Sequence, residues 1–244
     1  MLKKVWTIAE KDILMYYLKG PIIIFGVLFP FFLFFAFYIG RNLSLSFLLS
    51  GLVSMTIFFT STAVSPVIAP WETQMKTLER LISCPVSIKT IIMGDIFASF
   101  IFGVIISSVP ILFSICIGIN IYHPVLLFVG LIISAFCFSS LGILFSFPPT
   151  SLPSNIMMFS NLIKFPLIFM SGIFIPIGEL SETGRYFSFI SPLTYSTDIV
   201  RYSFGEKAYF SPFFNLFALL VFSSLFLLLA IYLHEKNLEK RFLR

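Results

Sequence analysis

The sequence predicts an all-α polytopic membrane protein, for three reasons. Hydrophobic residues make up 58% of the chain, only 11% of residues are charged, and the mean hydropathy is +1.02. A soluble domain carries about 25% charged residues, so this chain lacks the polar surface that water requires. The apolar residues also gather in runs long enough to cross a bilayer as helices, which satisfy their own backbone hydrogen bonds in lipid.

Six segments are predicted as membrane spans, because a helix needs about 20 mostly apolar residues to cross the hydrocarbon core. They are Pro21–Ile39, Leu45–Ala69, Ile91–Ile119, Pro124–Phe147, Ile156–Phe174 and Phe213–Leu233. Prolines within these segments are expected to kink the helices, which neighbouring helices in a membrane tolerate. These prolines are Pro30, Pro66, Pro110 and Pro166.

The distribution of basic residues predicts the orientation in the membrane. Eleven of the sixteen Lys and Arg residues flank the side that carries both chain ends and the segment between the second and third spans. Four, namely Arg41, Arg185, Arg201 and Lys207, fall on the other side. Because cytoplasmic segments are richer in Lys and Arg, we expect a multi-pass protein of the plasma (cytoplasmic) membrane with both termini in the cytoplasm. The net charge of +5 then reflects topology and anionic lipids rather than nucleic acid.

Residues 1–20 are predicted to form an amphipathic interfacial helix ahead of a six-span domain over residues 21–244. Apolar side chains recur at helical spacing, and Lys3, Lys4, Glu10 and Lys11 lie away from that stripe. The apolar positions are Leu2, Val5, Trp6, Ala9, Ile13, Tyr16 and Tyr17. A helix of this kind lies along the membrane surface. The alternative is a solvated leader without fixed structure.

Residues 71–83 interrupt the apolar sequence with a short charged helix between the second and third spans. Trp71, Met75, Leu78 and Ile82 form one apolar stripe, and charged residues occupy the opposite side. The charged residues are Glu72, Lys76, Glu79 and Arg80, of which Glu72 and Lys76 are spaced as a favourable i, i+4 pair. The pattern alone leaves open an interfacial helix that merely joins two spans.

Two separate motifs flank the middle of the chain. The first combines Glu72, Glu79, Leu81 and Pro85-Val86-Ser87, followed by Ile91–Asp95. The second runs from Ser171 to Pro176 and resumes over Ile190–Arg201 with the sequence Ser-Pro-Leu-Thr-Tyr. Together they resemble the motifs of the ABC type-2 exporter permeases, and the resemblance in topology covers the whole chain.

The resemblance implies that the 71–83 helix is a coupling helix, which docks on a separate ATP-binding-cassette ATPase. The residues expected to carry the coupling are Glu72, Lys76, Glu79, Arg80, Leu81 and Pro85. A phosphate-binding P-loop needs a Gly-Lys pair, and this sequence has none. We therefore expect a transport subunit, not an enzyme, that binds no cofactor itself. ATP and Mg²⁺ belong to the partner, and a second permease copy forms a homodimer within the membrane lipids.

The segment from about residue 175 to 205 is too short and too interrupted by Pro and Gly to cross the membrane twice. The resemblance implies a pair of re-entrant half-helices that dip in from outside and gate the pathway. A plain surface loop is the alternative. The predicted gate residues are Ser171, Gly172, Pro176, Pro192, Leu193, Thr194, Tyr195, Asp198 and Arg201, and Asp198 and Arg201 are spaced to pair on one helix.

Lys164 is the only basic residue predicted to lie within a span. Two interpretations are open. Its long side chain can snorkel toward the inner interface, or its charge can face a substrate pathway and meet an anionic group of the cargo.

Together these features predict the permease subunit of an ATP-driven exporter of drug-like or lipidic compounds. A polysaccharide-exporting permease of the same family is one alternative. An ion-coupled secondary transporter is another, disfavoured because the spans show no clear carboxylate and no repeat. A membrane enzyme is disfavoured because His123 and His234 are predicted on opposite sides of the membrane.

Overall fold

The computed structural model describes residues 2–39 and 44–242, and every regular element in them is a helix, so the all-α prediction is confirmed. Met1, residues 40–43 (with Arg41) and residues 243–244 lie outside the described part. The elements are α1 (Leu2–Asp12), the π-helix η1 (Ile13–Tyr17), α2 (Gly20–Tyr38), α3 (Leu45–Ser61), α4 (Ser65–Gln74), α5 (Thr77–Ser83), α6 (Ile88–Cys116), α7 (Pro124–Phe145), α8 (Pro153–Met170), the 3-10 turn η2 (Ile177–Glu179), α9 (Glu182–Ile190), α10 (Pro192–Ser203) and α11 (Pro212–Phe242).

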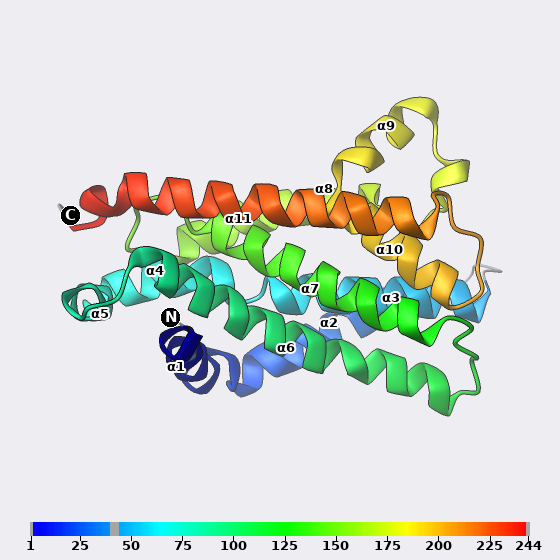
Figure 1. Cartoon of the computed structure of the whole chain (residues 1–244). Coiled ribbons are helices and arrows are strands. Elements are labelled where there is room, and N and C mark those ends of the chain that lie inside the picture. The colour runs from blue at the N-terminus through cyan, green and yellow to red at the C-terminus, as the bar shows by residue number, and fades with distance from the viewer. Residues whose placement is uncertain (1, 40–43, 243–244) are drawn as a thin grey trace.

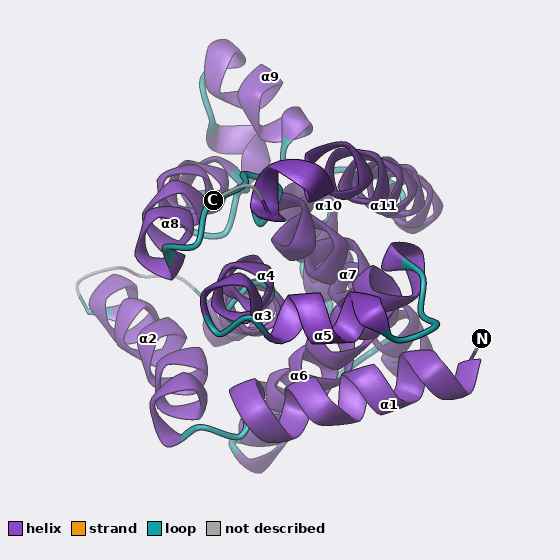
Figure 2. Cartoon of the chain, turned by 90° about the vertical axis from the view of Figure 1, so that its left-hand side faces the viewer, coloured by secondary structure: helices purple, strands orange, loops and turns teal. Residues whose placement is uncertain are grey.

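The α3–α4 pair forms the centre of a helical bundle. Figure 2 looks along the bundle and shows α3 and α4 surrounded by α2, α6, α7, α8 and α10. In the most apolar 18-residue stretch of Leu45–Gln74, 89% of the residues are buried, whereas in that of Pro212–Leu238 in α11 only 17% are buried. Four small polar side chains of α3 donate to carbonyls of their own helix and are therefore buried without losing a partner. They are Ser50, Ser54, Thr56 and Thr60.

Within the described residues, four helical stretches are long and apolar enough to cross a membrane. They are Leu45–Gln74, Ile88–Cys116, Pro124–Phe145 and Pro212–Leu238. A fifth is possible if Leu2–Tyr17 and Ile22–Leu33, which meet at 88°, are counted as one bent pair. The predicted span over Ile156–Phe174 is not among them. Its helix α8 has only 18 residues and contains Ser160, Asn161 and Lys164, so the six-span count stays a prediction.

The two ends of the chain lie at the same end of the bundle. Figure 1 places the N- and C-terminal ends there together with α5, while α9 and α10 lie at the far end. Helix α1 with Lys3, the turn between α4 and α5 with Lys76, and the part of α11 with Lys236 therefore lie at the same end. This arrangement fits an even number of crossings.

Candidate functional site

The charged segment after the central helices is a corner, not one helix, so the prediction of a continuous helix over 71–83 is wrong. Helix α4 begins at Ser65, passes through Pro70 and ends at Gln74. Lys76 then adopts a left-handed conformation with φ of 55°, and α5 starts at Thr77. A non-glycine residue with positive φ cannot continue an α-helix. The exposed position of Met75 follows from this break, because the expected apolar stripe ends there.

Helix α5 and the residues that flank it present most of the predicted coupling residues at the surface. Lys76, Glu79, Arg80 and Pro85 are exposed, and Leu81 is half-buried. Leu78 turns inward and holds α5 against the bundle. The result is a short polar projection at the end of the molecule that also carries both chain ends (Figure 2).

Glu72 does not belong to this exposed face. Its side chain is only 1% exposed and its Oε1 accepts from the Lys11 Nζ of the N-terminal helix. The predicted pair between Glu72 and Lys76 is therefore wrong, because the left-handed turn at Lys76 ends the helix on which they would meet. Glu72 instead anchors α4 to α1.

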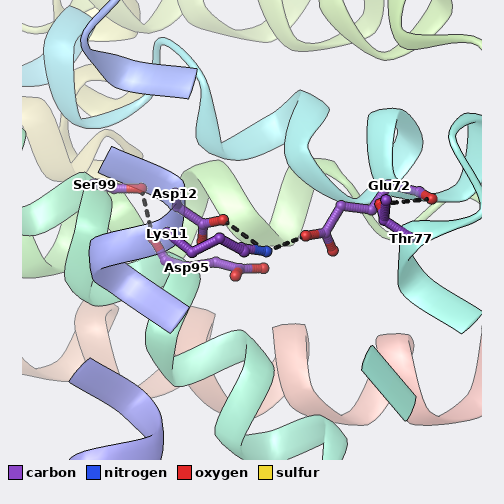
Figure 3. A network of polar contacts seen from close by, with 6 residues as sticks. All are labelled: Lys11, Asp12, Glu72, Thr77, Asp95 and Ser99. Carbon is purple, nitrogen blue, oxygen red and sulfur yellow. Dashed lines mark hydrogen bonds and ion pairs between the residues drawn. The ribbon is translucent and has the colours of Figure 1, made fainter. Parts of the chain in front are cut away.

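A buried cluster of charged groups surrounds this contact, as Figure 3 shows. Lys11 Nζ also lies 3.0 Å from Asp12 Oδ1, and Asp95 of α6 lies beside both residues. Burial disfavours the charge on Lys11, but the nearby Asp12, Glu72 and Asp95 outweigh it and raise the lysine pKa. Three carboxyl groups from three helices thus converge on one lysine.

Sequence reasoning missed this cluster, although one signal for it was present. Asp12 lies three residues after Ala9 and four before Tyr16, so it falls on the apolar stripe of the first helix. The structure buries all three side chains. The expectation that no span contains a clear carboxylate is also wrong, because Asp95 lies in α6 with 4% exposure.

The N-terminal helix is fitted closely to the bundle at this place. A Cβ at Gly94 would stand 2.5 Å from Ile8 Cγ2, so α1 approaches α6 as only glycine permits. Tyr17 Oη lies 2.5 Å from Ser99 Oγ. The Tyr16 ring stacks on the Trp71 ring, with 5.5 Å between the ring centroids. The solvated-leader alternative for residues 1–20 does not describe this packed helix.

The predicted gate residues come together at the opposite end of the bundle. Ser171 bonds to the Ile168 carbonyl at 2.7 Å, and Gly172 has a φ of +80° that makes the turn before Pro176. Helix α10 is buried along nearly its whole length. The gate residues that it contributes are Pro192, Leu193, Thr194, Tyr195, Asp198 and Arg201. A plain surface loop therefore does not describe α10, whereas α9 projects outward (Figure 1).

Asp198 and Arg201 do not form the predicted ion pair, because each is committed to other partners. Asp198 accepts hydrogen bonds from the backbone N–H groups of Tyr209 and Phe210 at 2.7 and 2.8 Å and from the side chain of Asn215 at 2.8 Å.

Arg201 donates from Nη2 to the Ile173 carbonyl at 3.0 Å. Its guanidinium lies 3.8 Å from the centre of the Phe47 ring. Through these partners the two residues tie α10 to the chain before α11, to the turn after α8, and to α3.

Lys164 lies at the break between α3 and α4. Its Nζ donates to the Thr62 carbonyl at 2.7 Å, and the residue is only 5% exposed. The side chain therefore does not snorkel to an interface. It supplies a donor where the central helix is interrupted between Ser61 and Ser65.

A helical bundle with four described stretches long and apolar enough to cross a bilayer is typical of an integral membrane protein. The sequence model of the ABC-2 type transporter family matches residues 3–205 of this chain. The match covers most of the length, so the chain belongs to that family, whose members are transport permeases. A search of curated proteins finds no match.

Proposed function

We propose that this chain is the membrane subunit of an ATP-driven exporter, with six spans, both termini in the cytoplasm and ATP hydrolysis on a separate ATPase subunit. The observation that carries the proposal is the exposed polar helix α5, set at the bundle end that holds both chain ends. Membership of the ABC-2 type transporter family supports it, because such permeases pair with an ATP-binding subunit.

The arrangement suggests how displacement of α5 by the ATPase reaches the membrane interior. Helix α4 joins α5 directly, and α3 continues α4 through the centre of the bundle. The Glu72–Lys11 contact adds the N-terminal helix to the same moving unit. Lys164 braces the break at Thr62, where the two halves can change their angle. A second copy of the chain would complete the pathway.

An apolar groove on the surface of the bundle supports a drug-like or lipidic cargo. It has a volume of about 690 Å³ and lies between α1, α6, α7 and α11. Trp6, Phe97, Phe100 and Phe136 contribute to its lining. Apolar aromatic surface suits a lipophilic molecule better than the hydroxyl groups of a polysaccharide.

One observation favours a second candidate, an ion-coupled secondary transporter. Buried ionisable groups within membrane helices often mark ion pathways, and Asp95 of α6 is such a group. The two candidates differ in their energy source, so the ATPase experiment below separates them.

The substitution Glu79→Lys should break docking on the ATPase. Its side chain is exposed on α5. We expect it to face a basic group of the ATPase, so that reversing its charge places like charges together across the interface. We expect a loss of about tenfold in co-purifying ATPase and in cargo-stimulated hydrolysis, with normal membrane insertion. Glu182→Lys, the same change on the exposed face of α9 at the far end, is the matched control. Wild-type coupling in Glu79→Lys contradicts the docking role, and transport without any ATPase favours the ion-coupled alternative.

A further inference from the structure

The junction of α1, α4 and α6 holds more negative than positive groups in a buried place. Asp12 has no exposed surface, Glu72 is 1% exposed and Asp95 is 4% exposed. Lys11 pairs with Asp12 and Glu72, and its charge also acts on Asp95. If Asp12 and Asp95 were both ionised, two buried like charges would face a lysine that Glu72 shares, which a low-dielectric interior strongly disfavours.

The contact between Asp12 and Asp95 contains no donor. The two carboxyl groups lie within hydrogen-bond reach of each other. Asp12 Oδ2 and Asp95 Oδ1 are buried and accept a hydrogen bond from no described group. Ionised carboxylates are acceptors only, and one must carry a proton before two of them can bond.

Arg80, a further cation near this contact, has an exposed side chain and lines a pocket with Lys11 and Glu72, not with Asp12 or Asp95. Asp95 also lines a small cavity of about 30 Å³ between α4, α5, α6 and α11, which is large enough for a water molecule. Helices α3 and α7, which pack on α6, carry no charged residue. The titratable and charged groups around the pair, by element, are Lys11 of α1, Tyr16 and Tyr17 of η1, Glu72 of α4, Arg80 of α5 and His234 of α11.

A metal ion is a poor substitute for the proton at this place. Among the described residues, no three His, Cys, Asp or Glu side chains converge closely enough to hold a metal. His234 lines the same small cavity as Asp95, and its Nε2 lies 3.0 Å from Ser146 Oγ and 3.1 Å from the Ile143 carbonyl.

We propose that Asp12 and Asp95 hold one proton between them, so that the docked N-terminal helix, α4 and α6 together form a proton-binding site. Burial raises the pKa of the Asp12 carboxyl above its ordinary value, with the Lys11 charge opposing the shift, which is the direction that a shared proton requires. Lys11 contacts both Asp12 and Glu72, and Glu72 lies near the end of α4, next to α5. The shared proton therefore sets how firmly α1 holds the turn between α4 and α5. This inference does not depend on the ATPase.

The direction of the pH dependence follows from the raised pKa. A carboxyl group that binds its proton more tightly in the folded state stabilises the fold most at low pH, below its ordinary pKa. That stability is lost as pH rises toward the raised value. One proton changes the unfolding equilibrium by up to about tenfold per pH unit in this window.

The test compares the full-length wild type with Asp95→Asn in detergent. The side-chain amide that this substitution introduces would donate to Asp12 as the proton does, and it cannot titrate. We expect wild-type thermal stability to fall as pH rises above about 4, the ordinary pKa of an aspartate, and Asp95→Asn to be flat and more stable above neutral pH. Glu182→Gln removes an exposed carboxyl group of α9 and should keep the wild-type profile.

A spectroscopic readout keeps the test decisive if that variant fails to fold. Wild-type protein at neutral pH should show the infrared C=O stretching band of a protonated carboxyl group, and Asp12→Asn should lack it. The proposal is overturned if the wild-type band is absent. It is equally overturned if Asp95→Asn keeps the wild-type pH profile, if His234→Gln alone removes that profile, or if Na⁺ at constant pH stabilises the wild type as acid does.

Discussion

Replacing Lys11 with methionine should destabilise the folded chain by about 3–5 kcal/mol, the range for removing one partner of a buried ion pair. Lys11 is 27% exposed, whereas its partners Asp12 and Glu72 are essentially buried. Methionine keeps the length of the side chain but leaves the carboxyl groups without a cation. Thermal unfolding of the full chain in detergent at neutral pH measures the loss.

The same substitution has a pH signature that separates charge from packing. Acid should restore part of the stability of Lys11→Met, because protons replace the lysine as neutralising charge. Lys3→Met removes a lysine from the exposed face of the same helix and is the matched control. A small and pH-independent loss in Lys11→Met would show that Lys11 does not neutralise the cluster.

The substitution Asp198→Ala should destabilise the packing of α10 against α11, at the end of the bundle opposite to α5. Three donors converge on this one carboxylate, and one of them, the Asn215 amide, is fully buried. Hydrogen bonds to a charged acceptor contribute about 1.5–3 kcal/mol each, although water can replace those near the surface. We expect a loss on the order of 3 kcal/mol and faster proteolysis between α10 and α11.

Two control variants show how much of the loss in stability comes from the hydrogen bonds that Asp198 accepts. Asp198→Asn keeps one carbonyl acceptor and should lose less than Asp198→Ala. Glu182→Ala removes an exposed carboxylate from α9 and should change stability little. Equal stability of Asp198→Ala and wild type would contradict the role of this residue in tying α10 to α11.

The features that sequence predicted well are those set by local pattern. The apolar runs predict the helices, the stripe from Leu2 to Tyr17 predicts an amphipathic N-terminal helix, and the motifs around Glu79 and Pro192 predict the family. Each of these depends on composition or on spacing along one helix, which can be read directly from the chain. That the N-terminal helix packs against α6 was not predicted.

The features that sequence did not predict depend on contacts between distant segments. The left-handed turn at Lys76 is a conformation that lysine seldom adopts, and nothing in the local sequence demands it. The pairing of Glu72 with Lys11 joins residues 61 positions apart. The spacing of three residues predicted an ion pair between Asp198 and Arg201. In the structure Arg201 instead contacts Phe47 of α3, and Asp198 accepts from the backbone just before α11.

The topology prediction likewise depends partly on local sequence pattern and partly on contacts between distant segments. The positive-inside rule predicts that the end with both termini faces the cytoplasm, and this orientation stays a prediction. The depth of α8 and α2 in a membrane depends on neighbours that their own sequences do not specify. The polar residues of α8 illustrate this, since Lys164 is buried against Thr62 rather than placed by hydropathy.

The most direct test of the account asks from which side of the membrane α5 can be reached. Cys84 directly follows α5 and is exposed, Cys116 ends α6 and is exposed, and Cys137 is buried. A membrane-impermeant maleimide should label Cys84 in a Cys116→Ser chain only in inside-out vesicles. Added ATPase subunit should then protect it. Labelling of Cys84 in sealed right-side-out vesicles would contradict the proposal that α5 receives the ATPase in the cytoplasm.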